Sequence, residues 1–250
     1  MGSTVCQAVA ADPGLELVAA VDPYHSGLEV SRVAGVAGVD LLVSADRQAF
    51  ADVGVHVAID FTEAAAAIDN LTFLGESGIH AVVGTTGLTE ADLAVIGNAF
   101  TTSNCLVAPN FAIGAILMMR FAAMAAPYFE TAEIIELHHD NKIDAPSGTA
   151  TLTAERMAAA SSTWAPDPTT VEVLSGARGS EGAGGIRIHS VRLRGLVAHQ
   201  EVLLGTTGQT LTIRHDSIDR TSFMPGVILA VHRIASHPGL VIGLESYLDD

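Results

Sequence analysis

The segment VHVAIDFTEAAAAIDNLTFLGESGIHAVVGTTG (residues 55–87) decides the fold class. Two short apolar runs, 55–62 and 80–87, each end in polar or glycine-rich residues, and an alanine-rich helical pattern over 63–78 separates them. A buried strand, a covering helix and a second buried strand in this order are typical of a parallel sheet. Glu63 suits the amino terminus of the helix because its charge complements the helix dipole. The segment therefore predicts an α/β fold.

The same alternation continues on both sides of this segment. Strands are predicted over residues 15–22 and 104–111, and a second helix with an acidic first turn over 89–100. In open α/β sheets, ligands bind at the carboxyl ends of the strands. The residues expected to face one crevice at that edge are Asp22, Phe61, Thr62, Gly84 to Gly87 and Ala108 to Phe111.

The pattern changes after a long helix predicted over residues 113–128. The next predicted elements are a strand at 132–139, a helix at 149–160 and strands at 186–193, 199–207 and 209–217. The last three runs alternate apolar and polar residues, as expected of a sheet with one open face. A final helix at 220–235 and a short apolar run at 240–248 are predicted to return to the first domain.

The sequence thus predicts a Rossmann-like, doubly wound parallel sheet plus a second α+β domain with a mixed, open-faced sheet. The predicted first domain comprises residues 1–111 and 220–250. The predicted second domain comprises residues 112–219.

The composition argues against several classes of protein. The formal net charge is −16, and no cluster of lysine and arginine offers the basic face that nucleic acid requires. No uninterrupted apolar run reaches about 18 residues, and the richest stretch, 111–129, predicts a buried helix. The amino terminus shows no secretory pattern, so we expect a cytoplasmic protein without a membrane partner. Cys6 and Cys105 lie in apolar contexts and suit reduced thiols.

The segment ELHHDNKIDAPSGTA (136–150) is the most informative part of the chain for chemistry. The segment places several polar residues close together in the sequence. They are two histidines at a strand end, the only lysine of the chain and a Ser-Gly-Thr run at a helix start: His138, His139, Lys142, Ser147, Gly148 and Thr149. A serine in that place is a good N-cap, and the two amides that follow it point outward at the positive end of the helix dipole. With the lysine they can hold a carboxylate. A histidine with an ordinary pKa of about 6.5 can transfer a proton near neutral pH.

Other interpretations of this segment stay open. A histidine at a strand end often makes only structural hydrogen bonds. A zinc site could use His138, His139 and either Asp140 or Asp144, but neighbours on a strand point to opposite faces and share one ion poorly. Ser147 as a nucleophile would need a G-x-S-x-G turn and a base, and APSGT is not that motif. We expect no metal site.

The turns after the first-domain strands suggest a nucleotide site. Gly84 to Gly87 follow a buried strand, where glycine lets a flat ring or a phosphate approach the backbone. Asp22 ends an earlier predicted strand, where a carboxylate can accept hydrogen bonds from both ribose hydroxyls of NAD. Each feature also occurs without a ligand, as a plain turn or as a helix cap before Pro23, and Ala108 to Phe111 could be a simple turn. The case depends on several turns meeting at one sheet edge.

Over nearly its whole length, the sequence resembles the dihydrodipicolinate reductase family, also called 4-hydroxy-tetrahydrodipicolinate reductase, of the actinobacterial type. The matching segments are VAIDFT, GIHAVVGTTG, APNFAIGA, ELHHDNKIDAPSGTA, GLVAHQEVLLGT and TIRHDSIDRTSFMPGV. The resemblance implies hydride transfer from NADH or NADPH to a small cyclic imine with two carboxylates. That reaction reduces 4-hydroxy-tetrahydrodipicolinate, via dihydrodipicolinate, to tetrahydrodipicolinate in lysine and diaminopimelate biosynthesis. The resemblance also implies a homotetramer formed through the second-domain sheet.

The resemblance further implies roles for individual residues. His138 is expected to be a proton donor or acceptor and Lys142 a second proton donor. Substrate contacts are expected from His139 and, through backbone amides, from Gly148 and Thr149. Cofactor contacts are expected from Asp22 at the adenosine ribose and, on the nicotinamide side, from Gly84, Thr85, Thr86, Ala108, Pro109, Asn110 and Phe111. The first domain would then bind the dinucleotide, and the second would bind the substrate and form the oligomer.

The start of the sequence differs from the family. Members of the family open with a first strand and a G-x-x-G-x-x-G turn that holds the pyrophosphate, whereas Met1-Gly2 matches only the end of that turn and residues 2–11 match the helix after it. Either the start was assigned too late, or the chain is a truncated form that we expect to bind NADH more weakly than a chain extended at its amino terminus. The alternative functions are a non-catalytic nucleotide- or metabolite-binding subunit and a metal-dependent hydrolase built on the histidine pair.

Overall fold

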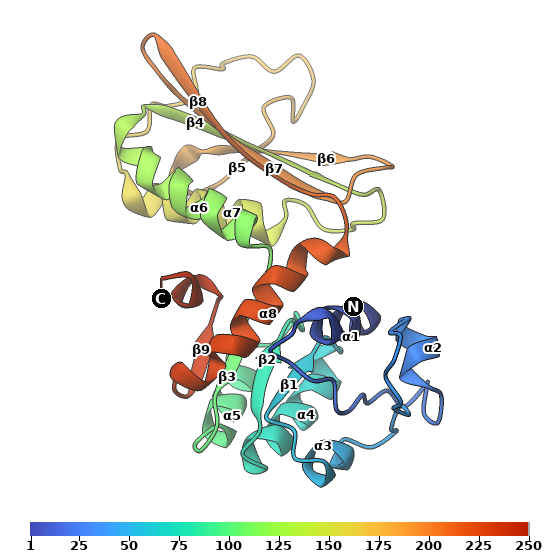
Figure 1. Ribbon diagram of the computed structural model, residues 1–250. Helices are drawn as coiled ribbons and strands as arrows, with labels where there is room; N and C mark the ends of the chain where they lie inside the picture. The colour runs from blue at the N-terminus through green and yellow to red at the C-terminus, as the bar shows by residue number, and fades with distance from the viewer. Residues whose placement is uncertain (250) are drawn as a thin grey trace. The chain divides into compact units, whose positions relative to one another are not determined.

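The computed structural model describes residues 1–249. Their contacts divide the chain into two compact units (Figure 1). Unit 1 comprises Met1–Ala112 and the residues from Arg220 onward, and unit 2 comprises Ile113–Asp219. The predicted fold class, a parallel α/β sheet followed by a second mixed sheet, is confirmed.

Unit 1 contains a four-stranded parallel sheet with the strand order β1-β2-β3-β9. The strands are β1 Val57–Asp60, β2 His80–Val83, β3 Cys105–Val107 and β9 Leu240–Ile242. The two middle strands are buried almost throughout, which is typical of a parallel sheet covered on both faces. Cys105 pairs with Ala81 on one side and with Leu240 on the other. This pairing confirms that the carboxyl-terminal run returns to the first domain.

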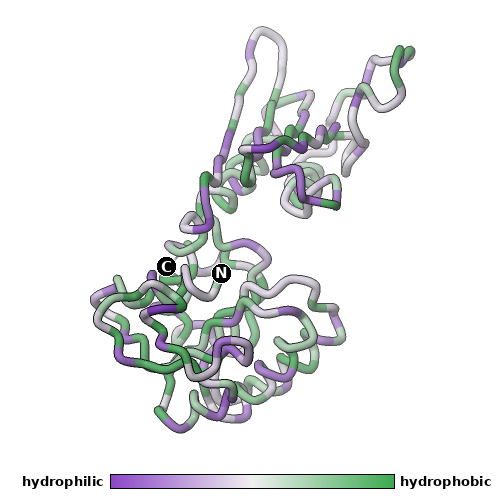
Figure 2. The backbone as a smooth tube through the Cα atoms, turned by 90° about the vertical axis from the view of Figure 1, so that its right-hand side faces the viewer, coloured by the Kyte–Doolittle hydropathy of each residue, from purple (hydrophilic) through white to green (hydrophobic). Residues whose placement is uncertain are grey.

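The helices of unit 1 enclose this sheet. They are α1 Gly2–Ala11, α2 Val30–Ala34, α3 Gln48–Asp52, α4 Ala64–Glu76, α5 Glu90–Ala99 and α8 Met224–Arg233, with 3-10 turns η3 Arg220–Phe223, η4 Ile234–Ser236 and η5 Glu245–Leu248. A capping box starts α5, in which Thr89 and Asp92 each accept from the other's backbone amide. Leu71 and Leu74 of α4 and Ile96 of α5 join the strand residues in one core. Hydrophobic and hydrophilic stretches alternate along this part of the chain (Figure 2).

The strand predicted over residues 15–22 is wrong. Within this segment, only Val21 pairs with another residue, in an isolated parallel bridge to Ser44, and none of the eight residues is buried. A strand requires a continuous ladder of backbone hydrogen bonds with a neighbour, and in the described sheet β1 pairs only with β2. The apolar side chains of the segment pack instead against a small cluster that includes Val30 and Val43.

Unit 2 contains a five-stranded mixed sheet with the order β5-β6-β4-β7-β8. The strands are β4 Thr131–His138, β5 Ser180–Glu181, β6 Arg187–Arg192, β7 Ala198–Thr206 and β8 Gln209–Ser217. β4 is parallel to β6 and antiparallel to β7, so the predicted mixed sheet is confirmed. The remaining elements are α6 Ile113–Ala125, α7 Gly148–Ala160, η1 Ala126–Tyr128 and η2 Ala183–Gly185.

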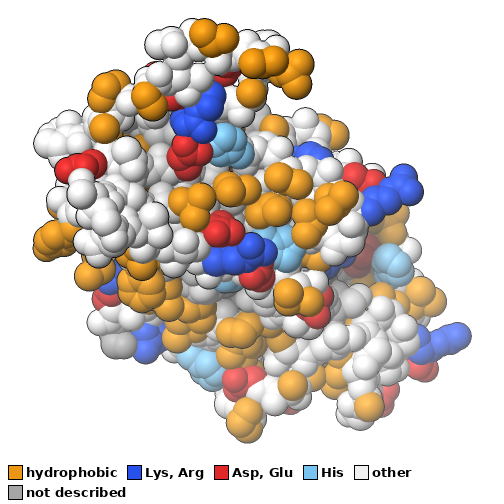
Figure 3. Space-filling model, turned by 90° about the horizontal axis from the view of Figure 1, so that it is seen from above, with side chains coloured by type: hydrophobic (Ala, Val, Ile, Leu, Met, Phe, Trp, Pro, Cys, Tyr) orange, Lys and Arg blue, Asp and Glu red, His pale blue; other side chains and the backbone are white. Residues whose placement is uncertain are grey.

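Helices α6 and α7 cover one face of this sheet (Figure 1). Gln200, Val202 and Leu204 of β7 are buried on that face, and the Gln200 Nε2 atom donates to Thr153 Oγ1 of α7 at 2.8 Å. Residues between them point to the opposite, open face, because side chains alternate along a strand. Hydrophobic side chains lie among acidic, basic and histidine side chains in the view of Figure 3.

The most apolar stretch of the chain forms the buried helix that was predicted. In α6, Ile116, Met118, Met119 and Ala122 are buried. Among residues 1–249, no helix is both long enough and apolar enough to cross a membrane. Cys6 and Cys105 are free thiols, as expected.

Candidate active site

In unit 1, a buried carboxylate joins the turns that follow two neighbouring strands. Asp60 ends β1, and its Oδ1 atom accepts from Thr62 N at 2.9 Å, from Thr62 Oγ1 at 2.7 Å and from Thr85 Oγ1 at 2.8 Å. Its Oδ2 atom accepts from Asn70 Nδ2 of α4 at 3.0 Å. Asp60 was not predicted as a functional residue, although an acidic residue that ends an apolar strand can indicate one. Asp60 fixes the start of the Gly84–Gly87 turn by holding Thr85.

The turns after β1, β2 and β3 come together as predicted. Gly84 N donates to Asp60 O at 2.8 Å, and Ala108 N donates to Val83 O at 2.9 Å. The rings of Phe61 and Phe111 lie with their centroids 5.8 Å apart. Thr85 is buried, whereas Thr86 and Pro109 are exposed. Asn110 Oδ1 accepts from Ala112 N at 2.9 Å, which shapes the turn into α6.

Gly84 is required by the close approach of an aromatic ring. A Cβ atom at this position would lie 2.0 Å from Cε1 of Phe61. We therefore expect Gly84→Ala to lower the free energy of unfolding by about 1–3 kcal/mol, since the ring must move to relieve the overlap. Chemical denaturation followed by circular dichroism measures this change.

The matched control is Gly97→Ala in α5 of the same unit. A Cβ atom there would lie 3.4 Å from Leu240 Cδ2, which is ordinary contact, and alanine favours a helix over glycine by up to about 1 kcal/mol. Gly97→Ala should therefore be neutral or stabilising. Equal stabilities of the wild type and Gly84→Ala would show that Phe61 does not constrain this turn.

Asp22 lies in a different part of unit 1. It lines a cavity of about 250 Å³ together with Gly2, Ser3, Cys6 and His25, among other residues, and the turns after β2 and β3 are not part of that lining. Its carboxylate accepts from Tyr24 N at 2.8 Å and pairs with His25 Nδ1 at 2.8 Å. Partial burial raises the pKa of Asp22, but the hydrogen bonds from His25 and Tyr24 outweigh this effect and lower the pKa overall. The expected meeting of Asp22 with the Gly84 turn is therefore not seen within the described cavity.

In unit 2, the predicted site segment begins where β4 ends. His138 is the last residue of β4, and its side chain is 16% exposed. His139 is exposed, and its carbonyl accepts from Lys142 N at 3.2 Å, which closes a tight turn. Lys142 Nζ donates to both oxygens of Asp144, at 2.7 and 2.8 Å. This ion pair is the main reason why the pKa of Asp144 is lowered.

The amino terminus of α7 has the geometry that the sequence predicted. Ser147 is the N-cap, and its Oγ atom accepts from Ala150 N at 3.2 Å. Within residues 1–249, the amides of Gly148 and Thr149 have no hydrogen-bond acceptor. A Cβ atom at Gly148 would meet no other atom within 4 Å. Two amide donors are thus open to an incoming anion at the positive end of a helix of 13 residues.

Two residues that were not predicted from the sequence, Glu136 and Arg192, support His138. Glu136 is fully buried, and its Oε2 atom lies 2.5 Å from His138 Nδ1. Arg192 of β6 donates to both oxygens of Glu136, at 2.8 and 2.9 Å. Burial lowers the pKa of His138, and the positive charges of Lys142 and Arg192 lower it further, so that Glu136 does not restore its ordinary value. The imidazole is therefore mainly neutral at pH 7.

The alternative chemistries gain no support from this geometry. Across residues 1–249, no group of three or more histidine, cysteine, aspartate or glutamate side chains is arranged to hold a metal ion. His138 is partly buried and His139 is exposed, as expected for neighbours at a strand end. The Ser147 hydroxyl oxygen accepts a helix amide as an N-cap, and no histidine contacts it in the described chain.

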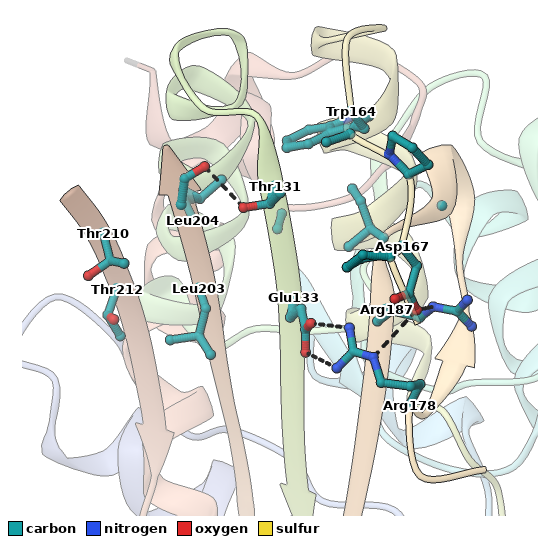
Figure 4. Close-up of a pocket in the computed structure, with 17 residues that line it drawn as sticks. Thr131, Glu133, Trp164, Asp167, Arg178, Arg187, Leu203, Leu204, Thr210 and Thr212 are labelled. Carbon is teal, nitrogen blue, oxygen red and sulfur yellow. Dashed lines mark hydrogen bonds and ion pairs between the residues drawn. The ribbon is translucent and has the colours of Figure 1, made fainter. Parts of the chain in front are cut away.

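A second polar cluster of unit 2 lies around a larger cavity of about 350 Å³. Arg178 reaches between Glu133 of β4 and Asp167 (Figure 4), and His189 Nε2 lies 2.8 Å from Glu133 Oε2. Residues 136–150 do not line this cavity. Since Glu133 precedes Glu136 by three positions on β4, the two carboxylates point to opposite faces of the sheet. The larger cavity is therefore separate from the histidine and lysine segment.

Known proteins resemble the chain over its full length. A family model described as dihydrodipicolinate reductase, N-terminus, matches residues 1–111, and one described as dihydrodipicolinate reductase, C-terminus, matches residues 114–248. A 4-hydroxy-tetrahydrodipicolinate reductase of Nocardia farcinica is 50% identical over 256 residues, with 100% of this chain and 94% of the relative covered. One of Mycolicibacterium vanbaalenii is 56% identical over 205 residues, covering 80% of this chain and 83% of the relative.

A solved structure supports the same relationship. The dipicolinate-bound dihydrodipicolinate reductase from Paenisporosarcina sp. TG-14 is 40% identical, with a TM-score of 0.85, 98% of this chain covered and 94% of that chain covered. The family models together span almost the whole sequence, and the resemblance inferred from the motifs is confirmed. The chain therefore belongs to the dihydrodipicolinate reductase family.

Proposed function

We propose that the chain is a cytoplasmic, nicotinamide-dependent 4-hydroxy-tetrahydrodipicolinate reductase. It reduces 4-hydroxy-tetrahydrodipicolinate, via dihydrodipicolinate, to tetrahydrodipicolinate in lysine and diaminopimelate biosynthesis. Relatives that bear this name are 50% and 56% identical to the chain. The observation that carries the proposal is the segment from Glu136 to Ala150. There a histidine at a strand end, an ammonium group and two open helix amides occur in one short stretch of unit 2.

The substrate side of the reaction belongs to unit 2. Lys142 and the amides of Gly148 and Thr149 bind the carboxylates of the substrate, and His139 contacts it. Lys142 Nζ already binds both carboxylate oxygens of Asp144, at 2.7 and 2.8 Å, so the substrate carboxylate must share or replace this contact. His138 donates or accepts a proton, and Lys142 is the second proton donor.

The cofactor side belongs to unit 1. The carboxylate of Asp22 receives the adenosine ribose, and its cavity beside the start of α1 offers the acceptor oxygens that ribose hydroxyls require. The nicotinamide side is held by Gly84, Thr85, Thr86, Ala108, Pro109, Asn110 and Phe111. Gly84 has no side chain to keep a flat ring away from the backbone. Asp60 fixes the conformation of this turn by accepting a hydrogen bond from Thr85. The nicotinamide group, when bound, supplies the hydride.

We propose NADH as the preferred cofactor because of the charge on Asp22. Its lowered pKa keeps the carboxylate ionised at neutral pH, and a negative charge repels the 2′-phosphate of NADPH. Asp22→Asn keeps an oxygen that can accept from Tyr24 N and removes the charge. We expect KM for NADH to rise about tenfold, as for the loss of one hydrogen bond to a charged group, while KM for NADPH falls or stays unchanged.

The control for this cofactor prediction is Asp12→Asn. Asp12 also lies in unit 1 and pairs with a histidine, His232, at 3.1 Å, but it does not line the cavity of Asp22. Steady-state kinetics with each cofactor should show no change in the ratio of the two KM values for Asp12→Asn. An equal effect of Asp22→Asn on both cofactors would remove Asp22 from the ribose site.

The direct test of the proposed function is a reductase assay with enzymatically generated dihydrodipicolinate. Oxidation of NADH that depends on the substrate is expected, with tetrahydrodipicolinate as the product. Binding of the nucleotide without any turnover would favour the non-catalytic alternative. Activity that disappears with a chelator would favour the metal-dependent hydrolase.

We further propose that the protein is a homotetramer that assembles through the sheet of unit 2. The face of this sheet opposite α6 and α7 is free of helices (Figure 1), and Thr210 and Thr212 of β8, which pair with Gly205 and Leu203, are exposed on it. Multi-angle light scattering of the purified protein measures the assembly directly. A mass of one or two chains at micromolar concentration would contradict the tetramer.

A further inference from the structure

Glu136 is a buried carboxylate whose two oxygens receive four hydrogen-bond donors. Oε2 contacts His138 Nδ1 at 2.5 Å and accepts from Arg192 Nη1 at 2.8 Å. Oε1 accepts from Arg192 Nη2 at 2.9 Å and from Ser147 N at 3.2 Å. A carboxylate has about four lone-pair positions for hydrogen bonds, so its capacity is filled. Glu136 and His138 share one face of β4, because they are two residues apart on a strand.

Arg192 extends this network to the turn that precedes α7. It lies on β6, where it pairs in register with His138 of β4. Its Nη2 atom donates to Asp144 O at 2.6 Å, and its Nη1 atom donates to Val191 O at 2.9 Å. The ion pair between buried Glu136 and partly buried Arg192 therefore connects the strand end that carries His138, the turn that carries Lys142 and the N-cap of α7.

We propose that Glu136, with Arg192, is the positioning residue of the site: it orients the imidazole of His138 through Nδ1 and fixes the Ser147 backbone ahead of the open amides. The inference rests on the proposed function, in which His138 transfers the proton and the amides of Gly148 and Thr149 bind the substrate. Glu136 touches neither the substrate nor the cofactor. It acts through His138 and Ser147.

The chemistry of the contact determines which nitrogen of His138 reacts. A carboxylate can only accept, so Nδ1 of His138 must carry a hydrogen whether the ring is neutral or charged. The nitrogen that gains and loses a proton is therefore Nε2. Burial raises the pKa of Glu136, but the hydrogen bonds from Arg192 and the other donors outweigh it and lower the pKa overall, so Glu136 stays ionised.

Glu136 orients the ring of His138, and burial together with the positive charge of Arg192 keeps Glu136 from raising the pKa of His138 above its ordinary value. The charged groups that act on His138 are Glu136 of β4, Arg192 of β6 and Lys142 of the following turn. Glu136 raises the pKa of His138, whereas burial and the two cations lower it. Removing the charge of Glu136 should therefore lower the pKa of His138 further.

The first test is the tautomer of His138 in the wild-type protein, which requires no substitution at Glu136. Long-range proton–nitrogen spectra of protein labelled in the histidine rings identify the protonated nitrogen, and the signals of His138 are those lost in His138→Gln. We expect neutral His138 to carry its hydrogen on Nδ1. A hydrogen on Nε2 would overturn the inference, whether or not the protein is active.

The second test is Glu136→Gln. At the Oε1 position both neighbours, Arg192 Nη2 and Ser147 N, can only donate, so the amide oxygen of glutamine should take that position and its amide nitrogen should face Nδ1. His138 should then change to the Nε2–H tautomer. Loss of the partner that orients a metal-bound histidine typically costs about 10- to 100-fold in activity, and we expect a comparable fall in kcat/KM here, because Glu136 orients His138 in the same way. The limb of the kcat/KM profile that reports His138 should also move to lower pH. An unchanged tautomer with unchanged kcat/KM would overturn the inference.

The matched control is Glu133→Gln on the opposite face of the same strand. Glu133 also binds a histidine and an arginine, with His189 Nε2 at 2.8 Å and Arg178 in an ion pair, but it lies outside the proposed site. Glu133→Gln should keep kcat/KM within about twofold and leave the His138 tautomer unchanged. If the His138 tautomer depends on Glu136 but the protein shows no turnover, only the proposed function is contradicted. If the protein shows turnover but neutral His138 carries its hydrogen on Nε2, only the role of Glu136 is contradicted.

Discussion

Replacement of His138 by glutamine is expected to lower kcat by about 10²- to 10⁴-fold, the range that general acid–base catalysis contributes. Glutamine keeps a polar end of similar reach, but it has no group that exchanges a proton near neutral pH. The affinity for NADH should stay within about twofold, because His138 belongs to unit 2 and the proposed cofactor residues belong to unit 1. Stopped-flow turnover and fluorescence titration with NADH measure the two quantities separately.

Two other histidine variants test whether the loss of kcat is specific to His138. His189→Gln removes a histidine that pairs with Glu133 on the other face of the unit 2 sheet, so kcat should stay close to the wild-type value. His139→Gln should raise KM for the substrate more than it lowers kcat, because His139 is proposed to bind rather than to transfer a proton. If His138→Gln kept a third or more of the wild-type kcat, His138 would not be the proton-transfer residue.

The pH profile provides a further check on His138. Burial and the nearby cations lower its pKa, so the free enzyme protonates His138 only below the ordinary value of about 6.5. The limb of kcat/KM that reports this group in the free enzyme should therefore lie on the acid side of that value. In His138→Gln this limb should be absent.

The fold was largely predictable because its signals are local. The alternation of apolar strands with acid-capped helices over 55–111 depends on residues close together in the sequence, and β1, β2 and β3 with α4 and α5 follow it. The strand predicted at 15–22 failed because a strand also needs a partner, and apolar residues alone do not specify one. The helices α2 and α3 have five residues each, which is too short for a clear helical period.

The candidate site was predictable only in part, because only some of its contacts join residues that are close together in the sequence. The N-cap at Ser147 and the open amides after it follow from neighbouring residues, and the structure contains both. The partner of Glu136 is Arg192, which is 56 residues away in the sequence. Likewise, Asp60 holds Thr85 across 25 residues. Such contacts arise from strand pairing, so a single sequence without its fold could not assign these residues a role.

Replacement of Lys142 separates binding of the substrate from proton transfer. Lys142→Met keeps the length of the side chain and removes the charge, and we expect kcat/KM to fall by about 10³- to 10⁶-fold. A hydrogen bond to a charged group contributes about 1.5–3 kcal/mol, which is about 10- to 100-fold in KM, and the loss of a proton donor adds about 10²- to 10⁴-fold in kcat. Steady-state kinetics with the substrate varied at saturating NADH gives both constants.

Lys142→Arg distinguishes the two contributions. Arginine keeps the positive charge, so KM should rise only a little, but its pKa above about 12 prevents it from giving up a proton, so kcat should still fall at least tenfold. The control is Arg194→Met, a cation that is 91% exposed and paired with Asp140 at 2.7 Å, which should leave both constants within about twofold. In a chain with a net charge of −16 and a single lysine, no other ammonium side chain is available to take over. Full kcat in Lys142→Arg would therefore leave Lys142 as an anion-binding group only, and the second proton would have to come from another donor.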